Sequence, residues 1–244
     1  MKLRTDWYST HLQQTITIVR WGDSGTPVLL FPTAGGDAEE CERFLMVKVL
    51  APLIEGGRIK LYSCDSVAGS AWTSRAGTGR HRSWVQNQFD KFVADELVGA
   101  IRQDCGSPDI EIITAGASIG AFNAVASLCR HPDIFKAAIG LSGTYDLTRW
   151  LDDDWNEDFY FSSPLHYLPG LGDSEQLAQL RQRFVLLATG EGQWEAPAET
   201  WQMAEVLGAK GIPNRVDPWG PDYDHNWPTW REMLPQYLEE LTSG

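Results

Sequence analysis

The sequence lacks the features of several large classes of protein. It has no long apolar run, because its most apolar stretch, FLMVKVLAPLI, is short and contains Lys48 and Pro52. We therefore expect no membrane span. The first residues, MKLRTDWYSTHLQQ, have no apolar core of the kind found in secretory signals. Internal repeats and low-complexity tracts are also absent, so a solenoid or a disordered array is not expected.

Positive charge and paired cysteines are scarce as well. The chain has 20 Lys and Arg against 33 Asp and Glu, a net charge of −13 that would repel nucleic acid. The four cysteines show no C-x-x-C spacing, so we interpret them as free thiols and expect a cytoplasmic protein. They are Cys41, Cys64, Cys105 and Cys129. No cluster has metal-ligand spacing, so we expect neither a metal nor a cofactor.

What the sequence does contain is an alternation of apolar strands with amphipathic helices. Its 244 residues, 43% of them hydrophobic, suit one domain over residues 1–244. Expected strands are 15–19 (an edge strand), 27–31, 59–64, 110–114, 136–143, 184–189 and 212–220. Expected helices are 38–57, 86–105, 121–130, 199–211 and 228–241. Residues 65–86 are expected as a long loop and 144–180 as irregular. The pattern predicts an α/β fold with a mostly parallel sheet covered on both faces.

One turn in this pattern carries a candidate nucleophile. The segment GASIG places Ser118 between Gly116 and Gly120, after an expected strand and before an expected helix. This is the setting of a nucleophile elbow, where bulky neighbours would clash and the helix N-terminus stabilises negative charge. The alternative is a glycine-rich connection in which Ser118 only caps the helix.

A nucleophilic serine needs a base, and the order Ser, acid, His selects among the five histidines. Only His225, in DYDHNW, follows the last expected strand and precedes the last helix. The alternative for His225 is a surface loop histidine.

The acid should follow the strand 184–189, where the sequence reads TGEGQWEAPAE. Glu191 and Glu195 both qualify, whereas Glu199 already lies inside the next helix. Either glutamate could instead be a solvated acid at a helix start. An oxyanion hole needs two backbone N–H donors, for which Ile119 and Ala34, in the loop PTAGG, are the candidates. For that loop the alternative is an ordinary turn.

In order along the chain, strand–PTAGG, strand–GASIG–helix, strand–TGEGQWE and DHNWPTWREMLPQYL resemble the esterase D-like branch of the α/β-hydrolases. That branch includes S-formylglutathione hydrolases, feruloyl and acetylxylan esterases and mycolyltransferases, and the likeness is strongest to a group of small, mostly uncharacterised bacterial esterases. The resemblance covers nearly the whole chain and implies the α/β-hydrolase fold. It also implies Ser118 as nucleophile, His225 as base, and Ala34 and Ile119 as oxyanion donors.

The sequence departs from the family at the acid. Many relatives carry Asp three residues after the glycine that ends the strand, and here that glycine is Gly190 and the position holds Gln193. Glutamine can hold a histidine but cannot stabilise imidazolium by charge. We therefore expect a longer loop that brings Glu195 to the site, with Glu191 as second choice.

These observations predict a serine carboxylic-ester hydrolase that acts on a small-molecule ester through an acyl-enzyme. An acyltransferase with the same Ser-Glu-His triad is one alternative, and a catalytically inactive binding module, favoured by Gln193, is the other. Trp72 and Arg75 of the expected loop 65–86, together with Trp194, are expected to border the pocket, and residues 144–170 to cap it. The C-terminal helix could pack on a partner, so a homo-oligomer is possible.

Overall fold

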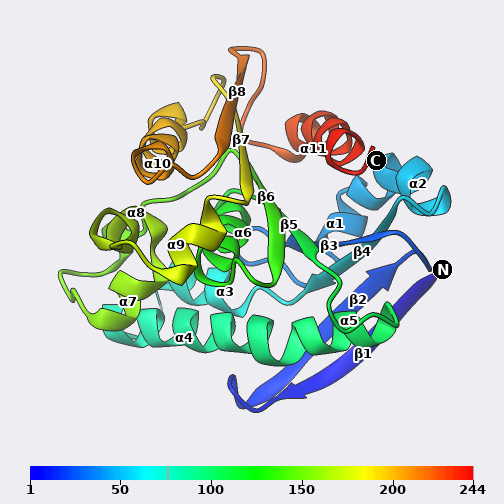
Figure 1. Ribbon diagram of the computed structural model, residues 1–244, viewed down its shortest axis with the longest axis horizontal. Helices are drawn as coiled ribbons and strands as arrows, with labels where there is room; N and C mark the ends of the chain where they lie inside the picture. The colour runs from blue at the N-terminus through cyan, green and yellow to red at the C-terminus, as the bar shows by residue number, and fades with distance from the viewer. Residues whose placement is uncertain (76, 244) are drawn as a thin grey trace.

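An eight-stranded sheet forms the centre of the computed structural model, which describes residues 1–75 and 77–243. The strand order is β1-β2-β4-β3-β5-β6-β7-β8 (Figure 1). β1 and β2 run antiparallel to their neighbours, and all other pairs are parallel. The strands are β1 Lys2–Ser9, β2 Gln14–Trp21, β3 Thr26–Phe31, β4 Ile59–Cys64, β5 Ile112–Ala117, β6 Phe135–Leu141, β7 Phe184–Gly190 and β8 Asn214–Gly220. The predicted mostly parallel sheet is confirmed.

Successive side chains of a strand point to opposite sides, so the apolar strands present apolar residues on both faces of the sheet, and helices cover both faces. In β3, for example, Leu29 and Phe31 join one hydrophobic core, and Val28 and Leu30 join the other. The first core is covered by α4 Gly79–Lys91, α5 Val98–Asp104, α6 Ile119–Arg130, α8 Pro164–Tyr167, α9 Glu175–Leu180 and α10 Pro197–Ala209. The second lies under α1 Glu40–Arg43, α2 Met46–Glu55 and α11 Trp227–Leu241. The π-helix η1 Phe92–Leu97 joins α4 to α5 on the first face. The remaining elements are α3 Val67–Ser74, α7 Glu157–Ser162 and two short 3₁₀ helices, η2 Thr148–Trp150 and η3 Leu168–Gly170.

Four sequence predictions about elements were wrong. Residues 144–180, expected to be irregular, contain the helices α7, α8 and α9. The strand at 15–19 is not at the edge, because β1 lies outside it; β1 is exposed along residues 2–8 and so lacks a strong hydrophobic pattern. Residues 65–86 are mostly helical, forming α3 and the start of α4. The helix expected at 38–57 is broken at Leu45, which adopts a left-handed φ of 65°.

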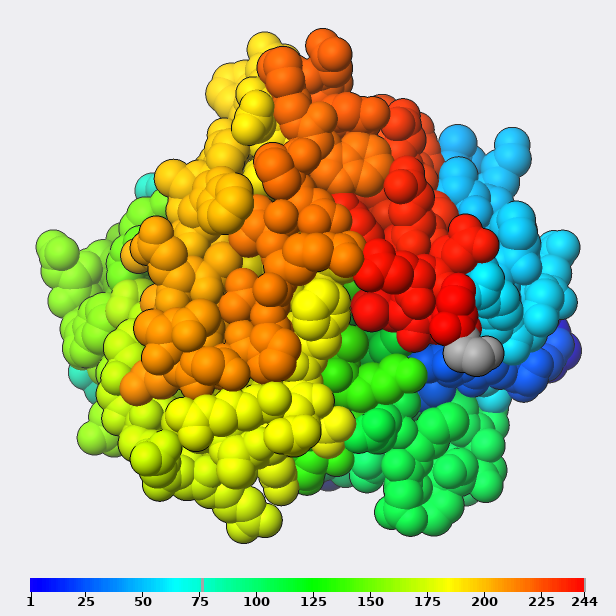
Figure 2. All heavy atoms as spheres, turned by 45° about the horizontal axis from the view of Figure 1, so that its top comes forward, coloured from blue at the N-terminus to red at the C-terminus, as the bar shows by residue number. Residues whose placement is uncertain are grey.

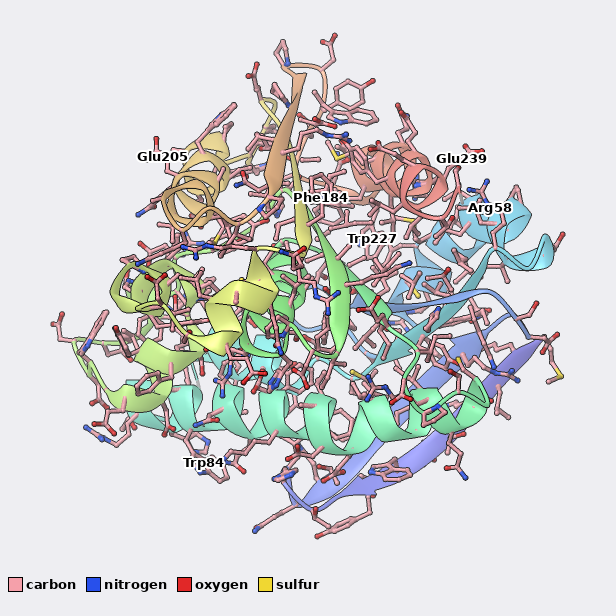
Figure 3. The ribbon with its side chains drawn as sticks, in the orientation of Figure 1. Arg58, Trp84, Phe184, Glu205, Trp227 and Glu239 are labelled. Carbon is pink, nitrogen blue, oxygen red and sulfur yellow. The ribbon has the colours of Figure 1, made fainter. Side chains whose placement is uncertain are left out.

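The C-terminal helix α11 is fixed at both ends. At its end, Arg58 donates to the carbonyl of Glu239 at 2.7 Å, and Figure 3 shows both residues on the same side of the molecule. At its start, Trp227 stacks on Phe44 with ring centroids 5.0 Å apart. Figure 2 shows α11 (red) beside the orange β8 segment and next to α2 (blue). Because α11 is fixed, the loop that precedes it is held in place where it joins the helix.

Three of the free cysteines are buried, and Cys105 is partly exposed. Burial, helped for Cys41 by neighbouring glutamates, raises the pKa of the Cys41 thiol to about 12, and burial raises the pKa of Cys129 to about 12. These thiols are therefore poor nucleophiles at neutral pH. In residues 1–75 and 77–243, no helix is long and apolar enough to cross a bilayer.

Candidate active site

Ser118 lies in a sharp turn between β5 and α6. Its backbone has φ 57° and ψ −124°, a conformation that costs an L-residue about 1–3 kcal/mol. Two neighbours hold it there: the Ser118 N–H donates to the carbonyl of Leu141 at 3.0 Å, and the N–H of Thr144 donates to the Ser118 carbonyl at 3.1 Å. The end of β6 and the loop that follows it therefore hold the turn by one hydrogen bond each.

Two glycines make this turn possible. A Cβ on Gly116 would lie 2.2 Å from the carbonyl oxygen of Gly120, and one on Gly120 would lie 2.6 Å from the carbonyl oxygen of Phe31. Both contacts are with backbone atoms, which cannot rotate away. The spacing G-x-S-x-G is therefore a steric requirement of the local fold.

The loop after β3 lies against the turn and is held by a buried carboxylate. Glu40 accepts hydrogen bonds from the Thr33 N–H at 2.8 Å and the Thr33 hydroxyl at 2.6 Å. Ala34, which follows Thr33, lines the same pocket as Ser118 and Ile119. The Ile119 N–H is at the first turn of α6, where amide groups have no intrahelical partner. The structure thus brings together both residues predicted to supply oxyanion donors.

His225 and Glu195 meet beside this turn. The His225 Nδ1 lies 3.7 Å from the nearer carboxylate oxygen of Glu195, whose side chain is 1% exposed. Within the described residues, Nδ1 is buried and has no hydrogen-bond partner. The nearby carboxylate is thus the group placed to accept a hydrogen bond from Nδ1–H. His225 and Ser118 line the same pocket.

A serine from a third loop holds the buried Glu195. The Ser142 hydroxyl donates to the Glu195 carboxylate at 2.6 Å and accepts from the indole N–H of Trp230 at 3.0 Å. The ring of Trp230 packs edge-on against His225, with centroids 5.2 Å apart. Ser142 and Trp230 therefore connect the carboxylate, the histidine and α11. Neither was predicted, although Ser142 directly follows a strand that ends at the same edge of the sheet.

The other candidate acids have different surroundings. Glu191 is exposed and does not line the pocket. Gln193 is exposed too; its carbonyl accepts from the His225 N–H at 3.0 Å, and its N–H donates to Asp224 at 2.6 Å. Gln193 therefore positions the histidine through its backbone. Glu199 borders the pocket but accepts from two backbone N–H groups, those of Tyr145 and Asp146.

The pocket has a volume of about 290 Å³ and is lined by residues from the segments that follow six strands, β3 to β8. It is lined by Ala34, Thr73, Ser118, Ile119, Ser142, Gly143, Thr144, Arg149, Trp150, Trp194, Ala196, Glu199 and His225. Trp194 lines it as predicted and is 82% exposed. From the predicted cap, 144–170, the residues Thr144, Arg149 and Trp150 reach it.

Two of the predicted pocket residues do not line it. Trp72 is fully buried in α3; its indole N–H donates to Gln86 at 3.1 Å, and its ring packs edge-on against Phe159. The prediction was wrong because residues 67–74 form a helix whose apolar side turns inward. Arg75 is exposed at the end of α3 and is also absent from the lining.

The cation beside the pocket is Arg149, which the sequence analysis missed. Its guanidinium lies 4.5 Å from the ring centroid of Trp150 and 3.4 Å from the carboxylate of Glu199. Arg149 lies in η2, in a stretch whose sequence has no periodicity, so no sequence signal pointed to it. Among the described residues no group of three His, Cys, Asp or Glu could hold a metal ion.

Solved structures of esterases share this fold. A ferulic acid esterase aligns with a TM-score of 0.74 at 15% identity, covering 99% of this chain and 98% of its own. An S-formylglutathione hydrolase from Agrobacterium tumefaciens aligns with a TM-score of 0.76 at 13% identity, covering 99% and 94%. A fluorophosphonate-binding serine hydrolase from Staphylococcus aureus gives 0.67 at 14%, covering 100% and 99%.

At these identities the similarity establishes the fold. No curated protein matches the sequence. The family described as "Putative esterase" matches residues 46–241, most of the chain. The resemblance stated from the sequence motifs is thereby confirmed. The chain belongs to this esterase family and has the α/β-hydrolase fold.

Proposed function

We propose that the chain hydrolyses small carboxylic esters through an acyl-enzyme, with Ser118 as nucleophile, His225 as base and Glu195 as acid. The observation that carries this proposal is the buried Glu195 carboxylate 3.7 Å from His225 Nδ1, at a pocket that His225 shares with Ser118. The distance is longer than a hydrogen bond. Catalytic contacts are often loose in a free enzyme and tighten when substrate binds.

In the proposed reaction, His225 Nε2 takes the proton of the Ser118 hydroxyl as its oxygen attacks the ester carbonyl. The negative charge on the carbonyl oxygen is stabilised by the N–H groups of Ala34 and Ile119. The tetrahedral species collapses, and the histidine gives its proton to the departing alcohol. A water molecule, deprotonated by His225, then attacks the acyl-enzyme and releases the acid and free Ser118.

Glu195 has two tasks in this scheme. It keeps the imidazole in the tautomer with the proton on Nδ1, and it stabilises the imidazolium that forms during attack. One carboxylate oxygen accepts from Ser142, and the other accepts from the Thr189 hydroxyl at 3.4 Å and is the one nearer to His225. Because the carboxylate is almost fully buried, its charge is weakly screened and acts strongly on the ring.

The pocket supports small substrates. Its volume of about 290 Å³ is at the lower end for ligand sites, so short acyl groups should fit best. Location in the cytoplasm and a single domain over residues 1–244 stay predictions from the sequence.

The test is hydrolysis of p-nitrophenyl acetate and p-nitrophenyl octanoate by the wild type and by Ser118→Ala. We expect turnover of the acetate, preference for it over the octanoate, and loss of both activities in the variant. Ser24→Ala changes an exposed serine in the turn before β3, at the end of that strand opposite Ala34, and is the control that should be unaffected. Adding an alcohol and measuring the new ester separates a hydrolase from an acyltransferase. Absence of any turnover would favour the binding module.

A further inference from the structure

The two edges of the sheet are protected to different degrees. β8 contains Pro218, which lacks an N–H, and has a register shift at its end. Such features prevent an edge from pairing with another chain. β1 has neither: its eight residues, KLRTDWYS, contain no proline or glycine and pair in continuous register with β2. Figure 1 shows β1 at the margin of the sheet, and among the described residues it pairs only with β2.

β1 also exposes large apolar side chains, and hydrogen bonds to Glu96 hold the strand and the turn that follows it in place. Leu3, Trp7 and Tyr8 are 48%, 37% and 63% exposed. The indole of Trp7 donates to Glu96 at 2.7 Å, and Glu96 also accepts from the N–H of Thr10 at 3.0 Å. The strand is therefore ordered before any partner binds, which lowers the entropic cost of pairing.

The hydrogen bonds of β1 show which backbone groups face the free edge. The Gly22 N–H donates to the Met1 carbonyl at 3.0 Å, which makes Met1 and Gly22 a hydrogen-bonded pair in the antiparallel ladder. In such a ladder these pairs alternate with non-hydrogen-bonded ones. The odd-numbered residues of β1 therefore direct their backbone groups to β2. The even-numbered residues 2, 4, 6 and 8 direct theirs outward.

Because only the even-numbered residues direct backbone groups to the free edge, few registers are open when β1 pairs with β1 of a second copy. A two-fold axis must place even residues opposite even residues, so near the middle of the strand it passes through Arg4, Thr5 or Asp6. An axis at Arg4 or Asp6 puts two like charges directly opposite each other, which is destabilising. An axis at Thr5 puts Arg4 of each copy opposite Asp6 of the other copy. This register also puts Leu3 opposite Trp7 and pairs residues 2–8 throughout.

We propose that β1 is the interface of a two-fold homodimer in which two copies pair antiparallel about Thr5 and join their sheets. The occupant is a second copy because the charge pattern is complementary to itself in this register. The Arg4 and Asp6 side chains, 3.4 Å apart within one strand, would form a four-membered ion-pair cluster across the axis. The apolar hollow that Leu3, Thr5 and Trp7 form with Ile101 would be continued by the partner's strand.

The test is the mass in solution at about 0.15 M salt, where the net charge of −13 is screened beyond about 8 Å. We expect twice the monomer mass of 27.3 kDa for the wild type. Asp6→Arg places two arginines opposite each other, and Arg4→Asp places two aspartates opposite each other. Each should dimerise about tenfold or more weakly. Mixing the two variants restores opposite charges across the axis and should produce a heterodimer.

A cross-link tests the register. Opposed residues of a non-hydrogen-bonded pair lie about 4.5 Å apart, within the range of a disulfide. Thr5→Cys, in a Cys105→Ser background, should therefore cross-link two copies, whereas Thr10→Cys should not. Esterase activity of the charge variants checks that they fold, since β1 is outside the candidate site.

Three results would overturn the proposal. They are a monomeric wild type, a dimer that Asp6→Arg leaves intact, and variants that do not associate on mixing. If the charge variants lose activity, the Thr5→Cys cross-link alone decides.

Discussion

The turn after β5 and the loop after β7 each supply a residue to the candidate active site, but they are held in different ways. The turn holds Ser118 by local sterics, since Gly116 and Gly120 are each within contact of backbone that tolerates no Cβ. The loop holds Glu195 by hydrogen bonds from distant parts of the chain, those of Ser142 and, through it, Trp230. Substitutions in the turn should therefore abolish activity, whereas substitutions around the loop should lower activity by intermediate amounts.

The largest effect is expected at the nucleophile. Ser118→Ala removes the attacking oxygen and should lower kcat/KM for p-nitrophenyl acetate by about four orders of magnitude. Because the change removes only the hydroxyl group and keeps the Cβ, the melting temperature should stay within a few degrees of the wild type. Residual activity within tenfold of the wild type would exclude Ser118 as nucleophile.

The steric requirement of the turn is tested by Gly116→Ala. The new methyl group would meet the carbonyl of Gly120 at 2.2 Å, so we expect a loss of about 3 kcal/mol in the free energy of unfolding, and loss of activity. Gly99→Ala is the matched control, because a Cβ there meets no atom within 4 Å and Gly99 is inside a helix. It should be neutral or stabilise by up to about 1 kcal/mol. Equal urea midpoints for the two variants would refute the steric account.

The acid loop is tested by comparing two glutamates. Glu195→Gln removes the charge beside His225 and should lower kcat about a hundredfold or more, with little change in KM. Glu191→Gln changes an exposed side chain outside the pocket and should stay within about twofold of the wild type. The reverse ranking would assign the acid to Glu191. A silent Glu195→Gln together with a silent Glu191→Gln would indicate a serine–histidine dyad.

Ser142→Ala tests whether a change around the loop lowers activity only in part. Ser142→Ala leaves the Glu195 carboxylate and the Trp230 indole N–H without their shared partner, so we expect kcat to fall about tenfold. Ser142 acts through Glu195, so Ser142→Ala should cost little in a Glu195→Gln background. Additive losses in the double variant would show that Ser142 acts by another route.

The smallest effect is expected at Gln193, the residue at the position where many relatives carry the acid. Its side chain is exposed, and only its backbone contacts His225 and Asp224. Gln193→Ala should therefore keep kcat within about twofold of the wild type. A loss comparable to that of Glu195→Gln would mean that the amide side chain holds the histidine.

The same contrast explains what the sequence could predict. The strands β3 to β8 and the Ser118 turn follow from local patterns, so the fold and the place of the serine were visible in the sequence. The course of the β7 loop depends on Ser142 and Trp230, which are far away in sequence, so Glu191 and Glu195 stayed open. Trp72 was misplaced because a Gly- and Ser-rich segment folded into a helix against Phe159. β1 was missed because a strand exposed on both faces has no buried side to mark it.

The central claim is that Ser118 is an activated nucleophile, and labelling with a fluorophosphonate followed by peptide mass spectrometry tests it most directly. The account predicts one adduct per chain, on Ser118, and its loss in Ser118→Ala and in His225→Ala, with Ser24→Ala still labelled. A wild-type chain that takes no label while remaining folded, or one labelled on another residue, would contradict it.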